Sequence, residues 1–221
     1  MVTGLQPSKA HSILGRVHRR AVFGRRVRVL AKMLSDQIPA GASLLDIGCG
    51  DGSIARVIGD NKLAADEVPL AAIQGIEFAP RGNCQVACTQ FDGGSIPFAD
   101  ATFEVCMFVD VLHHVPDSEG IGKLLSEARR VSKRYVLIKD HLSENGLDAL
   151  TLGFMDWVGN RPHGVVLPYN YQSRRDWEKH FQTAGLKVKE WQTRIPLYPL
   201  PFSLLFGRQL HFIGILERIG S

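Results

Sequence analysis

Residues 44–52 read Leu-Leu-Asp-Ile-Gly-Cys-Gly-Asp-Gly, and they give the strongest fold signal in this chain of 221 residues. An apolar run over residues 43–47 leads into alternating glycines, and a helical pattern with apolar residues at 54, 57 and 58 follows. This order predicts a strand, a glycine turn and a helix. Glycines allow the backbone to approach a ligand closely, and the helix N-terminus offers unpaired N–H groups to it.

The alternation of strands and helices continues along the chain. Helices are expected over residues 119–131 and 174–184, the second ending at Gly185. Strands are expected over residues 71–78, 85–91, 104–109, 135–138, 186–191 and 210–216. The pattern predicts one domain over residues 1–221 with a doubly wound α/β fold. We expect a seven-stranded, mostly parallel, Rossmann-like sheet with helices on both faces. Because the last two strands have no helix between them, one strand near the C-terminus should be antiparallel.

Three segments lie outside this alternation. Residues 1–40 carry eight Lys or Arg residues against one acid, Asp36, and are predicted to form a basic, helical N-terminal cap, with the helix over residues 11–38. This cap is a candidate lid over the ligand. Residues 141–173 and 193–208 are long for connections, and connections of this length commonly form binding loops. We expect both to be insertions that build a pocket.

Acidic residues stand at the ends of the first three predicted strands. Asp46 ends the first strand, Glu77 the second, and Asp92 directly follows the third. A carboxylate at the second strand can accept hydrogen bonds from ribose hydroxyls, and one at the third can accept from an adenine amine. The alternative interpretation is that the three acids only cap helices. Their repetition at successive strand ends favours a ligand that contains adenosine.

Four motifs together resemble those of class I S-adenosylmethionine-dependent methyltransferases. They are LLDIGCGDGS at residues 44–53, GIEF at 75–78, FDGGSIPFADATFEVCMFVDVLHHVPD at 91–117 and YVLIKDH at 135–141. The resemblance covers roughly residues 40–140 and is strongest to the group that includes ubiquinone- and menaquinone-pathway enzymes. It implies S-adenosylmethionine as the cofactor. Glu104 departs from the Asp that the family often has there.

The resemblance also implies roles for individual residues. Glu77 would hold the ribose, Phe78 would pack on adenine, and Asp110 with Val109 would face the sulfonium and its methyl group. The complete set of expected cofactor-binding residues is Asp46, Gly48, Cys49, Gly50, Gly52, Glu77, Phe78, Asp92, Gly93, Val109 and Asp110.

Histidines next to the fourth and fifth strands are the candidate bases. His113 and His114 follow the fourth strand and His141 ends the fifth, and His suits proton transfer at neutral pH. His114 is preferred because it matches the His of related methyltransferases. Asp110, Asp140 and His141 fall near the Mg²⁺ ligands of catechol-type enzymes, but His is a poor Mg²⁺ ligand. We therefore expect no metal.

The aromatic segment after the fifth strand is the predicted acceptor pocket, because pockets combine aromatic walls with a few polar groups. Its expected substrate-binding residues are Asp140, Trp157, Asn160, His163, Tyr169 and Tyr171. The alternative is a loop that packs only on its own aromatics. The expected activity is methyl transfer to an O, N or C atom of a small-molecule acceptor, lipid-like and aromatic molecules included. The apolar residues 198–206 could form the opposite wall, or contact a membrane surface or a second subunit.

Two other functions are compatible with parts of the sequence. An RNA methyltransferase would use the basic N-terminal helix on phosphates, but residues 109–112 lack the Pro-Pro-aromatic run of enzymes that methylate base amines. A nucleic-acid substrate is therefore not expected. The second alternative is a non-catalytic, cofactor-binding partner subunit. The absence of a signal peptide and of a membrane-length apolar run, together with cysteines in predicted core segments, predicts a soluble cytoplasmic protein. The oligomeric state is left open.

Overall fold

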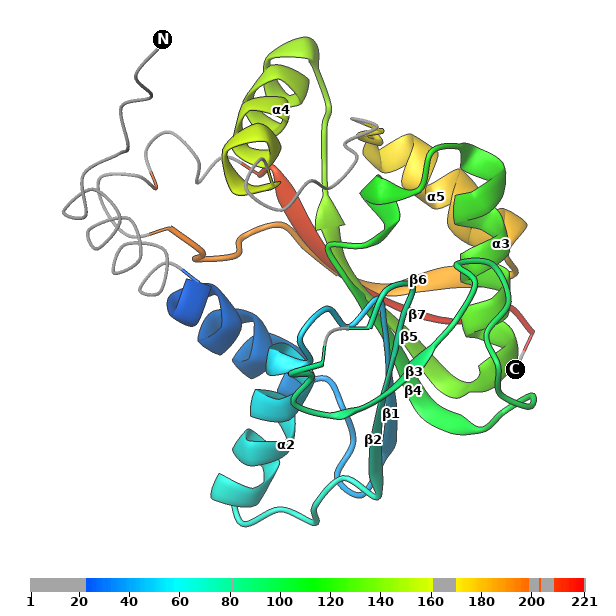
Figure 1. Cartoon of the computed structure of the whole chain (residues 1–221). Helices are drawn as coiled ribbons and strands as arrows, with labels where there is room; N and C mark the ends of the chain where they lie inside the picture. The colour runs from blue at the N-terminus through cyan, green and yellow to red at the C-terminus, as the bar shows by residue number, and fades with distance from the viewer. Residues whose placement is uncertain (1–22, 81, 161–169, 199–202, 204–208, 221) are drawn as a thin grey trace, which may run out of the picture.

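The computed structural model describes residues 23–80, 82–160, 170–198, 203 and 209–220 (Figure 1). Its centre is one seven-stranded sheet in the order β3-β2-β1-β4-β5-β7-β6. β1, β2, β3, β4 and β5 pair in parallel, whereas β7 is antiparallel to both β5 and β6. The predicted fold class is confirmed, including the single antiparallel strand. The strands are β1 (Ser43–Ile47), β2 (Ala72–Glu77), β3 (Ala87–Gln90), β4 (Phe103–Val109), β5 (Ser132–His141), β6 (Leu186–Gln192) and β7 (His211–Arg218).

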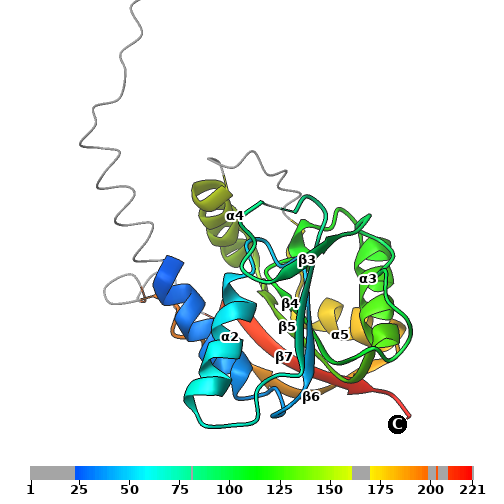
Figure 2. The same cartoon turned by 60° about the horizontal axis from the view of Figure 1, so that its bottom comes forward.

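Helices cover both faces of the sheet (Figures 1 and 2). α2 (Ser53–Ala64) and the helical residues 23–35 cover one face, while α3 (Ser118–Val131) and α5 (Arg174–Thr183) cover the other. Successive side chains of a strand point to opposite faces, and β5 shows this clearly. Its Val136 and Ile138 belong to the core under α3 and α5, whereas Leu137 belongs to the core under α2.

The helical residues 23–35 are part of the folded core. Leu30, Ala31 and Leu34 are fully buried against the sheet. This segment therefore cannot swing freely as a lid, because the movement would expose apolar surface to water. Residues 1–22 of the predicted cap lie outside the described residues.

The segment after β5 contains a helix that the sequence analysis missed. α4 (Gly146–Asn160) occupies much of the predicted insertion at residues 141–173. Asn145 caps this helix, since its Oδ1 accepts from the N–H groups of Leu147 and Asp148 at 3.0 Å. In Figure 1, α4 stands above the end of the sheet.

Among the described residues, none of the helices combines the length and the apolar character needed to span a membrane.

Candidate active site

The glycine loop after β1 is shaped to receive a ligand. Gly48, Gly50 and Gly52 have φ angles of 72°, 58° and 71°, a backbone region that favours glycine. A Cβ on Gly48 would lie 2.7 Å from Val111, so this position has no room for a side chain. A Cβ on Gly50 would meet no atom within 4 Å, so the loop opens onto free space there.

Glu77, at the end of β2, is tied to this loop. Its Oε2 accepts the N–H of Gly50 at 2.8 Å and its Oε1 accepts the N–H of Phe78 at 2.9 Å. The Cys49 amide is also held, donating to Ile76 O at 3.1 Å. The carboxylate that should bind ribose therefore lies against the loop that should hold the rest of the cofactor.

Phe78 and the loop after β3 form the outer end of the cradle. Phe78 is 64% exposed, and its ring lies 3.6 Å from where a Cβ of Gly93 would be. Asp92 Oδ1 accepts from the N–H groups of Gly94 and Ser95 at 2.8 and 2.7 Å, and these bonds lower the pKa of Asp92. An exposed aromatic face beside an ionised carboxylate fits an adenine ring and its amine.

Asp46 lies beneath the loop and is buried. Burial, together with the nearby Glu77 and Asp51 carboxylates, raises the pKa of Asp46 to about 7. Asp46 therefore keeps its proton to a much higher pH than an ordinary carboxyl group does.

Asp110, directly after β4, forms ion pairs with Lys139 and Arg26. Its φ of 56° is unusual for a residue other than glycine and turns the chain sharply at the strand end. Burial alone would raise the pKa of Asp110, but the two cations hold it well below its ordinary value. Within the part of the chain that the structure describes, the Asp110 carboxylate therefore has two cationic partners.

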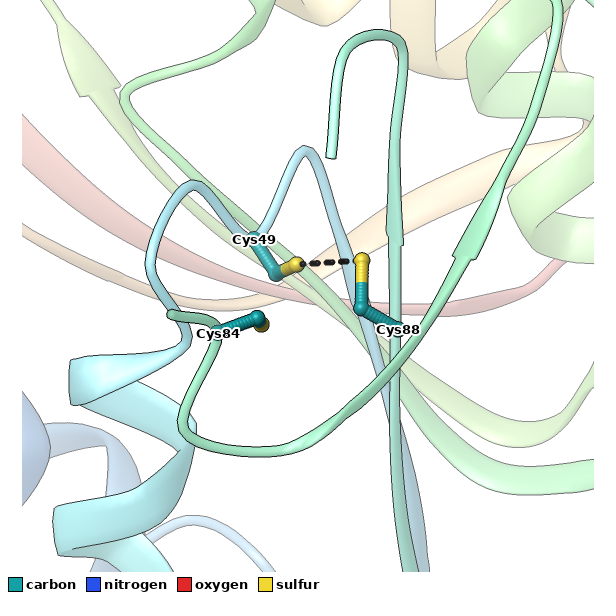
Figure 3. A group of neighbouring side chains, drawn as sticks. All are labelled: Cys49, Cys84 and Cys88. Atoms are coloured by element: carbon teal, nitrogen blue, oxygen red, sulfur yellow. Dashed lines mark hydrogen bonds between the residues drawn. The ribbon is translucent and has the colours of Figure 1, made fainter. Parts of the chain in front are cut away.

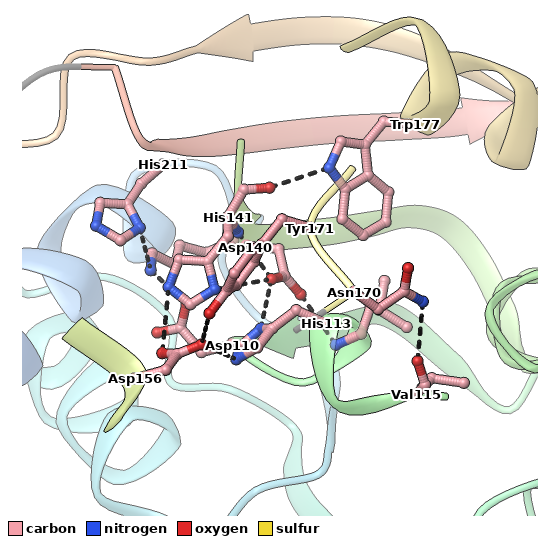
Figure 4. A network of polar contacts seen from close by, with 12 residues as sticks. Asp110, His113, Val115, Asp140, His141, Asp156, Asn170, Tyr171, Trp177 and His211 are labelled. Carbon is pink, nitrogen blue, oxygen red and sulfur yellow. Dashed lines mark hydrogen bonds and ion pairs between the residues drawn. The ribbon is translucent and has the colours of Figure 1, made fainter. Parts of the chain in front are cut away.

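His113 and Asp140 form a buried pair beside Asp110 (Figure 4). His113 lies in the short helix η1 (Leu112–His114), and its Nδ1 is 2.7 Å from Asp140 Oδ1. The N–H groups of Leu112 and His141 also donate to Asp140, at 2.9 and 2.7 Å. Burial would lower the pKa of His113, but the Asp140 carboxylate outweighs burial and raises it. Asp140 thus fixes His113 with Nδ1 toward the carboxylate and Nε2 away from it.

The Nε2 side of His113 faces a second carboxylate, which comes from α4. Asp156 Oδ2 lies 3.9 Å from His113 Nε2, and Asp156 Oδ1 lies 4.0 Å from His141 Nε2. Tyr171 donates to Asp156 at 2.5 Å, and its ring plane is inclined by 28° to that of His113, with centroids 6.5 Å apart. Asp156 from α4 and Tyr171 from the chain before α5 thus lie beside His113 and His141, as Figure 4 shows.

His114 and His141 occupy different environments from His113. Burial and the neighbouring His113 lower the pKa of His114, and its buried Nδ1 has no hydrogen bond within the described part of the chain. Burial also holds the pKa of His141 well below its ordinary value, so this ring is neutral at pH 7. Of the three candidate bases, His113 therefore has the raised pKa and a direct hydrogen bond to a carboxylate.

The far side of the network is formed by Lys139, His211 and Tyr198. Lys139 Nζ is 3.3 Å from His211 Nδ1, and Tyr198 OH is 3.4 Å from His211 Nε2. Burial and the adjacent Lys139 keep the pKa of His211 well below its ordinary value, and burial raises the pKa of Tyr198 to about 12. Both side chains are neutral at pH 7.

The spacing of four side chains in this network would also suit a metal ion. Asp110, His113, Asp140 and His141 each have a ligand atom within 4.8 Å of the others. The two carboxylates are, however, already compensated by Lys139, Arg26 and His113. A cation here would have to displace or oppose these positive groups.

Comparison with known proteins identifies the family. A methyltransferase domain profile matches residues 17–190. The chain belongs to the methyltransferase domain family. The chain is 31% identical over 116 residues to demethylmenaquinone methyltransferase of Tropheryma whipplei (strain Twist), a match that covers 48% of this chain and 43% of that protein. It is 29% identical over 169 residues to 27-O-demethylrifamycin SV methyltransferase of Amycolatopsis mediterranei (strain S699), covering 72% of this chain and 59% of the relative. These matches span about half the length of the curated relatives.

Solved structures share the fold of this methyltransferase. A chain of the complex between the Haloferax volcanii Trm112 methyltransferase activator and a methyltransferase superposes with a TM-score of 0.69 at 14% identity, covering 97% of this chain and 100% of that chain. Magnesium protoporphyrin IX methyltransferase (ChlM) from Synechocystis PCC 6803, with bound SAH, gives a TM-score of 0.54 at 15% identity, covering 98% and 90%. The family and the fit of the cradle identify S-adenosylmethionine as the cofactor of this methyltransferase.

The structure gathers most of the predicted site residues at one edge of its sheet. The glycine loop, Glu77, Phe78, Asp92 and Gly93 surround the cradle, while the histidines and Asp140 lie at the ends of β4 and β5. Trp157 lies on α4 and is 46% exposed, and Asn160 is the last residue of that helix. His163 and Tyr169 lie outside the described residues. The roles assigned to all these residues stay predictions.

Five residues of the network were not predicted from the sequence. Asp156 faces the histidines because α4 folds back over the sheet, an arrangement that a loop interpretation could not foresee. Arg26 and Tyr198 come from segments interpreted as a lid and a connection. Lys139, which directly follows the apolar run of residues 135–138, was a usable signal, since a buried charge without a partner is costly. His211, beside it on the neighbouring strand β7, completes the set.

Proposed function

We propose that this methyltransferase transfers a methyl group to a small-molecule acceptor that loses a proton during the reaction, such as a phenol-like hydroxyl, with His113 as the base. The buried pair of His113 and Asp140 is the observation that carries the proposal. Asp140 orients the ring and stabilises the positive charge that develops when His113 takes up a proton. Asp156 and Tyr171, on the Nε2 side, would border the acceptor.

In this arrangement the cofactor and the protein side chains would have separate roles. When bound, S-adenosylmethionine supplies an electrophilic methyl group. His113 Nε2 would accept the acceptor's proton, the acceptor atom would form a bond to the methyl carbon, and the carbon–sulfur bond would break. Holding the two reactants in line supplies much of the rate, and covering by α4 would limit water. Lys139 and Arg26 keep Asp110 ionised and fixed at the strand end.

The relatives support a small-molecule acceptor. Two of them are named for methyl transfer to demethylmenaquinone and to 27-O-demethylrifamycin SV. α4 also presents an apolar face to the surroundings, which suits a largely apolar acceptor. This face consists of Leu147, Leu150, Phe154 and Trp157.

The test is methyl transfer from labelled S-adenosylmethionine to a panel of phenols, hydroxyquinones and amines. His113→Gln should lower kcat about 10²- to 10⁴-fold, the usual contribution of a general base. His114→Gln is the matched control, because its ring lies next to His113 without a carboxylate on Nδ1. Full activity in His113→Gln together with loss in His114→Gln would assign the base to His114 and overturn the proposal.

A further inference from the structure

Three of the four cysteines converge behind the cofactor loop (Figure 3). Cys49 belongs to the loop itself, Cys84 to the connection between β2 and β3, and Cys88 to β3. Their Sγ atoms all lie within 4.8 Å of one another, and those of Cys49 and Cys88 are 3.6 Å apart. The fourth cysteine, Cys106, is buried in β4 and belongs to the core under α3 and α5.

Glycines leave the space that these sulfur atoms occupy. A Cβ on Gly75 would lie 2.6 Å from Cys49 Sγ, and a Cβ on Gly52 would lie 3.1 Å from Cys84 Sγ. Gly75 lies inside β2 and has no positive φ, so its backbone conformation does not require glycine. Glycine within a strand costs stability because it has no side chain to pack. Room for the Cys49 thiol accounts for Gly75.

We propose that Cys49, Cys84 and Cys88 form a site for a thiophilic divalent cation, Zn²⁺, bound by three thiolates with a fourth position open to water. Sulfur is the only ligand type in the cluster, and thiolates select Zn²⁺ and other soft cations. This proposal departs from the expectation of no metal. The three cysteines are spaced irregularly along the chain, and their sulfur atoms meet only in the folded structure.

The distances suit this ion. Zn–S bonds of about 2.3 Å in a tetrahedral arrangement place the sulfurs about 3.8 Å apart. The distance of 3.6 Å between Cys49 and Cys88 is close to that value. It is far longer than a disulfide bond of about 2.05 Å.

The charges around the thiols favour a dication. Burial, with the nearby Asp46 carboxylate, raises the pKa of Cys49, and burial also raises that of Cys88, to which Glu77 adds. Each thiol that binds Zn²⁺ would release its proton to solvent, and the dication would offset the negative charge of thiolates and carboxylates.

Zinc at this position would brace the cofactor loop. Cys49 lies between Gly48 and Gly50, so a metal would tie the loop to β3 through Cys49 and Cys88. If the metal holds the loop in its binding conformation, the loop loses less conformational entropy when the cofactor binds. We expect zinc-loaded protein to bind S-adenosylhomocysteine several-fold more tightly than metal-free protein.

Metal titration tests the site directly. The full chain would first be reduced and stripped of metal with a chelator. Titration with Cd²⁺ then reports sulfur ligands through thiolate charge-transfer absorption. Titration with Zn²⁺ in competition with a chromophoric chelator measures the affinity. We expect one equivalent to bind, with affinity at least tenfold weaker in Cys84→Ser and Cys88→Ser. Cys106→Ala, the matched control, should bind like the wild type. Absence of Zn²⁺ binding, or an equal loss of affinity in Cys106→Ala, would overturn the proposal.

Alkylation of the unmodified protein gives a second test that needs no substitution. Zn²⁺ should protect Cys84 and Cys88 from iodoacetamide, as read by mass spectrometry, and equal labelling with and without Zn²⁺ would overturn the site. Calorimetry with S-adenosylhomocysteine then tests the bracing of the loop, which an unchanged or weaker affinity in the zinc-loaded protein would refute. Both metal readouts are independent of the acceptor and of His113.

Discussion

The Asp140 carboxylate binds His113 Nδ1, and its effect on the pKa of His113 can be measured through the pH dependence of the reaction. Because the carboxylate raises the pKa of His113, the wild type should lose activity as the pH falls through a value above the ordinary His pKa. In Asp140→Asn this acid limb should move to lower pH. kcat should also fall, by about 10²-fold or more, because the ring is no longer oriented and stabilised. Profiles of kcat against pH would show both effects, and an unmoved limb would contradict the assignment.

Asp46 makes stability depend on pH in the opposite way to an ordinary surface carboxylate. Its folded-state pKa of about 7 exceeds the unfolded value of 3.8, so the folded state binds the extra proton. The stabilising effect of that proton is complete below pH 3.8 and is lost as the pH rises through about 7. Asp46→Asn removes this dependence.

We therefore expect Asp46→Asn, without cofactor, to gain stability relative to the wild type between pH 5 and pH 8. The shift of the Asp46 pKa sets an upper limit of roughly 4 kcal/mol on this gain in the free energy of unfolding. Urea unfolding at the two pH values measures it. Asp60→Asn, an exposed acid on α2, is the control and should show no such trend. If the stabilities of the wild type and of Asp46→Asn change in parallel from pH 5 to pH 8, the raised pKa of Asp46 is contradicted.

The helix α4 places Asp156 beside the histidines, and Asn145 caps its N-terminus. Asn145→Ala removes the side chain that accepts the N–H groups of Leu147 and Asp148. Loss of such a cap costs about 1 kcal/mol. We expect faster amide exchange along α4 and a lower kcat, because Asp156 loses its fixed position.

Leu150→Ala is the matched change on the same helix, since Leu150 is exposed and belongs to the helix interior. It should leave exchange near the wild-type rate. Equal exchange in the two variants would show that Asn145 does not hold the helix.

Most strands of the sheet were predictable because each is a short run of apolar residues, or of alternating apolar and polar residues, between turn residues. β5 is the exception, since it spans Ser132–His141 where the sequence indicated residues 135–138. Its polar C-terminal end, Lys139–His141, pairs with β7, and Ser132 at the other end pairs with Phe103 of β4, long-range partners that no local pattern reveals. α4 was missed for a related reason. Its apolar residues cover more than one face, and its exposed stripe lacks the polar outer face by which amphipathic helices are recognised.

The site was predictable where one motif supplies neighbouring residues and unpredictable where distant segments meet. Gly48, Glu77 and Asp92 follow strands, so their common edge follows from the fold. Asp156 and Arg26 reach the histidines and Asp110 only through the packing of helices that have no motif.

In the whole molecule, Arg26 joins the N-terminal part to the ends of the central strands. Removing its charge leaves Asp110 with Lys139 alone, so Arg26→Gln should lower the free energy of unfolding by about 1–2 kcal/mol. It should also lower kcat, because Asp110 is less firmly held. Urea unfolding and steady-state kinetics measure both effects. Arg28→Gln should change neither, because Arg28 is exposed and its Nε donates to the nearby Gly24 O. Equal losses in the two variants would refute a specific role for the ion pair.

The order of strands in the sheet also constrains how the chain folds during synthesis. β7 lies between β5 and β6, although it follows both in the sequence. While the ribosome is still adding residues 193–210, β6 has already been made but its pairing partner has not. The edge of β5 that β7 later covers is open during this interval, and open strand edges invite pairing with other chains. A pause in translation before His211 would prolong that exposure, so nascent chains stalled there should associate with chaperones far more than chains released after Arg218.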